Sequence, residues 1–152
     1  MEPLNGKCYC GNIHLTVTLS RDPSAVNPRA CDCDYCQKHG AAYVSDPRGT
    51  LDIRIRDERE LGRFQQGSEI AEMLLCRRCG VLVAALFRDA DRLFGTLNVK
   101  ALDRRADFGA KVAVSPKSLA ADEKTERWRE LWFPDVRVRS VESWTGTAGA
   151  DP

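Results

Sequence analysis

The sequence has no long hydrophobic run and no basic segment at its start. Its longest apolar stretch covers only residues 81–87, whereas a membrane-spanning helix needs about 20 consecutive apolar residues. Residues 1–6 carry neither the positive charge nor the apolar core of a secretory signal. We therefore expect no membrane span and a cytoplasmic location, a compartment in which thiols stay reduced.

An excess of either charge is also missing. The 152 residues include 23 Lys and Arg against 22 Asp and Glu, a formal net charge of +1. Nucleic-acid-binding domains usually carry a clear basic excess, so nucleic acid is not an expected partner. Hydrophobic residues make up 43% of the chain, which is typical of a globular protein. We assign residues 1–144 to a single domain and expect the small, polar residues 145–152 to form a disordered tail.

Alternation of apolar and polar residues predicts several short strands, most clearly at residues 13–19 and 51–55. Further extended segments are expected at residues 29–33, 61–66, 70–75, 81–87, 92–99, 112–114 and 136–138. Residues 35–40 suit one helical turn, and residues 117–132 have a composition that favours helix. The predicted fold class is therefore mainly β, with a short C-terminal helical segment.

All cysteines gather in three clusters. The seven cysteines are Cys8 and Cys10, then Cys31, Cys33 and Cys36, then Cys76 and Cys79. Disulfides fit poorly, because the number is odd and the expected compartment is reducing. A redox motif at Cys76 and Cys79 would need a helix directly after it, and strand-like residues follow instead. Metal binding is the remaining interpretation, with zinc as the ion.

Two of the clusters can close one zinc tetrahedron. Cys8 and Cys10 are separated by one residue, so both thiolates project to the same face of an extended chain. Cys76 and Cys79 are separated by two residues on a turn that Gly80 makes flexible. Zinc prefers four such ligands in a tetrahedron, and a closed set of four thiolates is typical of a structural site.

The remaining cluster offers only three thiolates, from Cys31, Cys33 and Cys36. Three protein ligands and one open position are typical of a reactive zinc site. A fourth ligand could instead complete this site, and the nearest candidates are His39, Asp32 and Asp34. From ligand counting alone, we predict two zinc ions per chain, one structural and one catalytic, with this alternative for the second site left open.

The three clusters resemble those of the glutathione-dependent formaldehyde-activating enzymes, a family that also contains the centromere protein V domain. The similar stretches are residues 6–13, residues 31–36 with the following 40–42, and residues 76–80, and the likeness covers about residues 5–104. The resemblance implies small antiparallel sheets around the zinc sites, an arrangement called a β-tent. It also implies structural zinc ligands at Cys8, Cys10, Cys76 and Cys79, and catalytic ones at Cys31, Cys33 and Cys36.

The function implied by this resemblance is that of a carbon–sulfur lyase. Such an enzyme would add a small-molecule thiol, possibly glutathione, to a small aldehyde at the open three-thiolate zinc. A different class of function is a zinc-stabilised binding module without catalysis. Arg77 and Arg78 could pair with a substrate carboxylate, but we interpret them as offsetting the negative charge of the four-thiolate zinc. The sequence does not indicate an oligomeric state.

Overall fold

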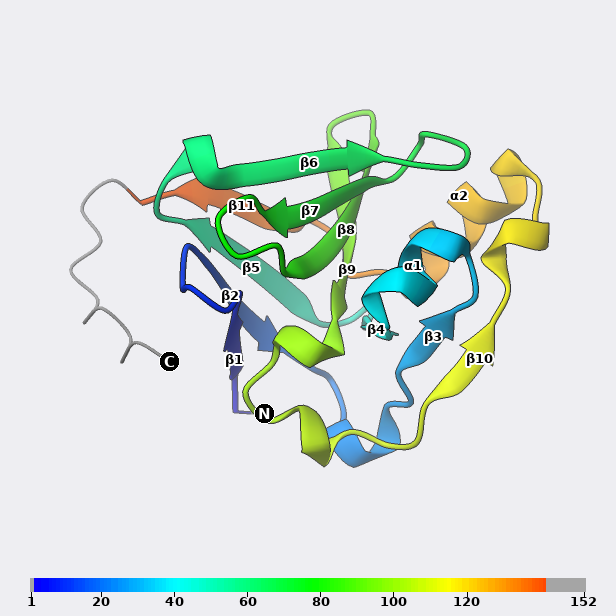
Figure 1. Cartoon of the computed structure of the whole chain (residues 1–152). Coiled ribbons are helices and arrows are strands. Elements are labelled where there is room, and N and C mark those ends of the chain that lie inside the picture. Colours follow the sequence, from blue (N-terminus) through cyan, green and yellow to red (C-terminus); the bar gives the residue numbers. More distant parts are fainter. Residues whose placement is uncertain (1, 142–152) are drawn as a thin grey trace.

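The computed structural model describes residues 2–141 and contains two β-sheets (Figure 1). In the smaller sheet the strand order is β1-β2-β5-β11. Its strands are β1 (Leu4–Lys7), β2 (Ile13–Thr18), β5 (Thr50–Ile55) and β11 (Arg137–Ser140). Along β2 and β5 buried residues alternate with half-buried or exposed ones, so one face of this sheet is turned to the core.

The larger sheet has the strand order β10-β3-β4-β9-β8-β7-β6. Its strands are β3 (Arg29–Cys31), β4 (Tyr43–Val44), β6 (Leu61–Gln65), β7 (Glu72–Cys76), β8 (Leu82–Asp89), β9 (Arg92–Asn98) and β10 (Val112–Val114). Strand β8 is buried from Leu82 to Phe87 without alternation, because both faces of the sheet are covered at this point.

Two helices accompany the larger sheet. Helix α1 (Asp34–His39) follows β3 directly and ends at Gly40, which adopts the left-handed conformation with φ of 59°. Helix α2 (Ala121–Leu131) comes late in the chain and packs against β8 and β9 of the larger sheet. Short 3-10 turns lie at Pro23–Ala25, Glu58–Glu60, Val99–Ala101, Arg105–Asp107 and Pro116–Ser118.

The apolar residues form two clusters, one on each face of the larger sheet. The first contains Ile13 and Ile53 from the smaller sheet together with Leu74 and Leu97 from the larger, so it is the core between the sheets. The second includes Met73, Phe87 and Trp132, with Trp128 and Leu131 of α2 packed against it. From Ala84 to Phe87, neighbouring residues of β8 alternate between the clusters, because successive side chains of a strand point to opposite faces.

The mainly β fold class is confirmed, including the two small sheets and the short C-terminal helix. Two pairings differ from the expected antiparallel ones, because β10 pairs with β3, and β11 with β5, in parallel. Parallel neighbours need a long connection, and here each late strand pairs with a strand that comes much earlier in the sequence. The helix is shorter than the predicted 117–132, because Pro116–Ser118 forms a 3-10 turn and α2 begins only at Ala121.

The two remaining structural expectations concern the ends of the domain and the membrane. The predicted boundary at residue 144 and the predicted tail at 145–152 lie outside the described residues. Among residues 2–141, no helix combines the length and the apolar character required to cross a membrane.

Phe133 provides a test of the core between the sheets. Its side chain is fully buried, and its backbone exchanges hydrogen bonds of 2.8 and 3.0 Å with Gly95 of β9. We expect Phe133→Ala to lower the free energy of unfolding by about 3–5 kcal/mol, because it leaves a cavity in a packed core. Urea denaturation at fixed zinc and reductant concentrations measures this loss.

Phe64→Ala is the matched control, since the Phe64 side chain is 47% exposed. It should cost less than about 1 kcal/mol. Equal losses for the two variants would show that Phe133 is not part of the cooperative core.

Candidate metal centres and the adjoining pocket

Four cysteines meet where a turn of the smaller sheet approaches a turn of the larger one. Cys8 and Cys10 lie between β1 and β2, Cys76 is the last residue of β7, and Cys79 lies in the turn before β8. Their Sγ atoms all lie within 4.8 Å of one another. The Sγ of Cys10 is 3.8 Å from that of Cys8 and 3.5 Å from that of Cys76. We call this group the four-sulfur cluster.

Both turns of the four-sulfur cluster contain a glycine in the left-handed region. Gly11 has φ of 85° and Gly80 has φ of 79°, a conformation that costs glycine little because it has no Cβ. After Cys76 the chain reverses at once, and the N–H of Gly80 donates to the Cys76 carbonyl at 2.7 Å. The N–H of Ile13 donates to the Cys8 Sγ at 3.3 Å, so one sulfur is already oriented by backbone.

The spacing of these sulfurs fits a zinc ion. Thiolate sulfur lies about 2.3 Å from zinc, so two corners of a tetrahedron are about 3.8 Å apart. The observed separations of 3.8 and 3.5 Å match this value, whereas a disulfide would need about 2.05 Å. All seven cysteines are free thiols. Burial raises the pKa of Cys8, and deprotonation of such a thiol needs a positive partner such as a metal ion.

The other three cysteines form a second group around the start of α1, the three-sulfur cluster. Cys31 is the last residue of β3, Cys33 is the N-cap of α1, and Cys36 lies in its first turn. The N–H of Cys36 donates to the Cys33 Sγ at 3.4 Å, as a polar side chain does when it caps a helix. The three Sγ atoms lie within 4.8 Å of one another, so this cluster could also hold a metal ion.

Two polar side chains contact the three-sulfur cluster from the larger sheet and its loops. The hydroxyl of Tyr43 lies 3.1 Å from the Cys36 Sγ in a buried position. The amide of Gln66, in the loop between β6 and β7, donates to the Cys33 Sγ at 3.8 Å. The hydrogen bond from Cys36 lowers the pKa of Cys31 to about 6, whereas burial and the nearby Cys36 raise the pKa of Tyr43. Tyr43 therefore stays protonated and can donate to a thiolate.

Among residues 2–141, no further His, Cys, Asp or Glu joins the three-sulfur cluster. The ring of His39 packs on Tyr35, with 4.7 Å between the ring centroids. Both residues, together with Phe64, line a separate shallow hollow at the surface. Asp32 lies 3.9 Å from the ammonium of Lys117, and Asp34 is exposed in the first turn of α1. The structure thus leaves all three candidate fourth ligands outside the group.

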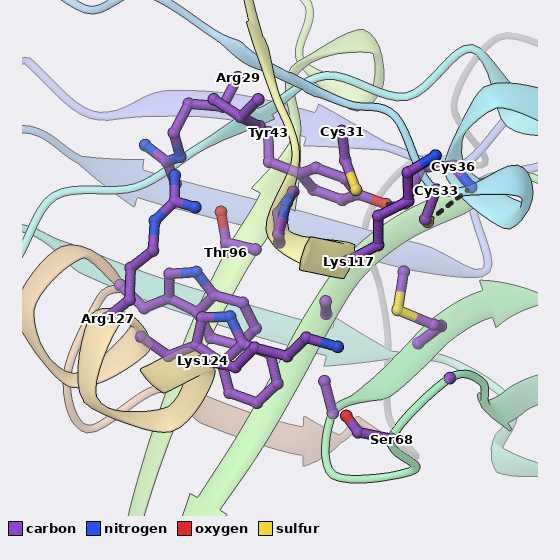
Figure 2. Close-up of a pocket in the computed structure, with 18 of the residues that line it drawn as sticks. Arg29, Cys31, Cys33, Cys36, Tyr43, Ser68, Thr96, Lys117, Lys124 and Arg127 are labelled. Carbon is purple, nitrogen blue, oxygen red and sulfur yellow. Dashed lines mark hydrogen bonds between the residues drawn. The ribbon is translucent and has the colours of Figure 1, made fainter. Parts of the chain in front are cut away.

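The three-sulfur cluster lines a pocket with a volume of about 160 Å³ (Figure 2). The sheet face behind it contributes Tyr43, Met73 and Thr96, and α2 contributes Trp128. The loop between β6 and β7 borders the pocket at Gln66–Ser68, and the segment after β10 borders it at Pro116 and Lys117. The thiolates therefore face a space that a small molecule can enter.

The charged residues of this pocket are all basic. They are Arg29, Lys117, Lys124 and Arg127, and no Asp or Glu among the described residues 2–141 lines the space. Burial lowers the pKa of Arg29 to about 10, and the positive charge of Arg127 adds to the effect. Arg77 and Arg78, next to a cysteine in the sequence, are exposed and do not line this pocket.

Sequence analysis did not identify these pocket residues. One signal for Arg29 was present, since it stands two residues before Cys31 in an extended segment and so shares its face. For Arg127 and Lys124 the sequence carries no such signal, because they come from a helix that reaches the pocket only through the fold.

The described part of the chain is thus a mainly β protein with two cysteine clusters that could hold metal. The family model of the glutathione-dependent formaldehyde-activating enzyme matches residues 3–117, and the chain belongs to this family. A crystal structure of a Rhodobacter sphaeroides protein is similar in fold, with a TM-score of 0.54 and 23% identity; the alignment covers 73% of this chain and 100% of that one. A search among curated proteins found no match.

Zinc content tests the two clusters separately. Protein purified under reducing conditions should carry about two zinc ions per chain. Cys76→Ser should lower this to about one and destabilise the fold, because ligation energy at the four-sulfur cluster is folding energy. Cys33→Ser should also lower it to about one but leave unfolding nearly unchanged. Metal release with a colorimetric chelator gives the counts, and loss of both ions from Cys33→Ser would contradict two independent sites.

Tyr43 provides a second test of the three-sulfur cluster. Tyr43→Phe removes the hydroxyl that contacts the Cys36 Sγ and keeps the ring. We expect zinc affinity at this cluster to fall about 10–100-fold, as for other lost hydrogen bonds to metal ligands. Competition with a chelator measures it, and the zinc of the four-sulfur cluster is the internal reference. Equal weakening at both clusters would indicate a general loss of structure instead.

Proposed function

We propose that this protein is a zinc-dependent carbon–sulfur lyase that adds a thiol to a small aldehyde at the three-sulfur cluster. The observation that carries the proposal is that Cys31, Cys33 and Cys36 form a group without a fourth protein ligand among the described residues and line a pocket. Membership of the formaldehyde-activating family supports the same reaction class. Glutathione and formaldehyde are the proposed substrates by analogy with the family name.

The donor set of the three-sulfur cluster suits zinc with one exchangeable position. When bound, zinc would act as a Lewis acid and favour the thiolate form of an incoming thiol. The protein residues contribute orientation: Tyr43 and Gln66 contact two of the sulfurs and hold them in one arrangement. Met73 and Trp128 form an apolar part of the pocket wall.

The reaction itself needs no redox partner. The thiol sulfur forms a bond to the carbonyl carbon, the carbonyl π bond breaks, and the oxygen gains a proton in place of the one that the thiol loses. The product is a hemithioacetal, which for formaldehyde is the S-hydroxymethyl derivative of the thiol. The structure offers basic donors for the developing negative oxygen, since Lys117 and Lys124 both line the pocket.

Exchange NMR with formaldehyde and glutathione tests this function. The zinc-loaded protein should accelerate exchange between free formaldehyde and its thiol adduct above the uncatalysed rate. Cys33→Ser should abolish the acceleration and keep the fold, because the residual pair of thiolates no longer holds the ion. Circular dichroism checks the fold of each variant.

His39→Ala is the matched control. His39 is the histidine nearest to the cluster in sequence, but it lies outside the pocket, so this variant should retain the acceleration. If the wild-type protein carries zinc at both clusters and accelerates no exchange with any thiol, the catalytic proposal is wrong and a non-catalytic binding module takes its place.

A further inference from the structure

Two arginines from distant parts of the chain converge in the pocket without a carboxylate between them. Arg29 belongs to β3 and Arg127 to α2, and both are half-buried. Figure 2 shows their guanidinium groups next to each other, at the side of the pocket away from Cys33 and Cys36. Among residues 2–141, neither arginine takes part in any of the ion pairs that the structure contains.

The guanidinium of Arg29 is held in a fixed position. Its Nη2 donates to the Oγ of Ser45 at 2.7 Å, and this hydroxyl donates in turn to the carbonyl of Leu131 at 2.7 Å. Ser45 is buried, with 4% of its surface exposed. Because Leu131 is the last residue of α2, the same contacts connect Arg29 to the helix that carries Arg127. Arg29 is therefore fixed by the fold, and Arg127 comes from the helix to which these contacts connect it.

Two like charges repel each other, and water screens this repulsion less effectively at a half-buried site than at an exposed one. The repulsion is offset when an oxyanion lies between the guanidinium groups, each of which can donate two parallel hydrogen bonds to a carboxylate. The charges that surround the pair point to the same ligand, since Lys117 and Lys124 are the other charged residues of the pocket. The arginine pair has the composition of a carboxylate site.

The arginine pair and the three-sulfur cluster are close enough to contact one small molecule. Arg29 and Cys31 are two residues apart on β3, which places their Cα atoms about 7 Å from each other on the same face. Tyr43, which contacts the Cys36 Sγ, is the register partner of Arg29 on β4.

We infer that the thiol substrate of this protein carries a carboxylate, which binds between Arg29 and Arg127 while the sulfur lies at the three-sulfur cluster. The position of the substrate sulfur rests on the proposed function. The position of the substrate carboxylate does not, because it follows from the arginine pair. Arg29 and Arg127 are thus residues that determine specificity.

Ligand binding tests the carboxylate end without turnover. Trp128 and Trp132 line the pocket, so tryptophan fluorescence reports binding to zinc-loaded protein. Mercaptoacetate should bind at least about tenfold more tightly than neutral 2-mercaptoethanol, the ratio expected for a charge-assisted hydrogen-bonded pair. Propionate, which has no thiol, should compete with mercaptoacetate. Zinc content measured after each titration excludes removal of the metal by the thiol.

Arg127→Gln should remove the preference for the carboxylate, and Arg127→Lys should restore part of it, because the charge returns without the fork of donors. Arg129→Gln is the matched control on the same helix: Arg129 pairs with Asp89 outside the pocket, so this variant should keep the full preference. Equal binding of the charged and neutral thiols by the wild-type protein, or an unchanged preference in Arg127→Gln, would overturn the inference.

Turnover separates this inference from the proposed function. Binding that depends on Arg127, with no accelerated exchange for any thiol, would leave the carboxylate site in place and remove the catalytic role. Exchange with glutathione that is accelerated equally by the wild type and by Arg127→Gln would keep the catalytic role and remove the carboxylate site. The reaction would then proceed without the arginine pair.

Discussion

The meeting of four sulfurs between the two sheets is the constraint on which the remaining structure depends. Cys8 and Cys10 extend from the smaller sheet, and Cys76 and Cys79 from the larger one, so a metal ion at this point would join both sheets. The ligand pairs are far apart in the chain, with a separation of 66 residues between Cys10 and Cys76. Closing a loop of that length costs conformational entropy, and ligation there contributes directly to folding.

With one face of the larger sheet packed against the smaller sheet, its other face is free to form the pocket. Strand β8 shows this division, since Ala84 and Leu86 belong to the core between the sheets, whereas Ala85 and Phe87 belong to the second cluster. The three-sulfur cluster packs on this second side, where Tyr43 contacts Cys36. The two candidate metal centres thus stand in different environments, one at the seam of the sheets and one beside a pocket.

Local patterns predicted much of this fold, and contacts between distant residues account for what they missed. Alternation identified β2 and β5, and cysteine spacing predicted the two sulfur groups that the structure brings together. Strand β4 was missed because two residues are too few for a period. The parallel pairing of β10 with β3 depends on a distant edge. Proximity in sequence drew attention to Arg77, whereas the pocket takes Arg127 from a helix that follows a long connection.

The helix that carries Arg127 and Trp128 begins at Ala121, after the last residue of the family match at position 117. Divergence in this late segment can therefore reshape one wall of the pocket while every thiolate stays as it is. The contribution of Arg127 to ligand choice would then be inherited on a different stretch of the chain from the thiolates and Arg29. Relatives that share all seven cysteines could differ in their substrates for this reason, and grafting the late segment between them would transfer selectivity.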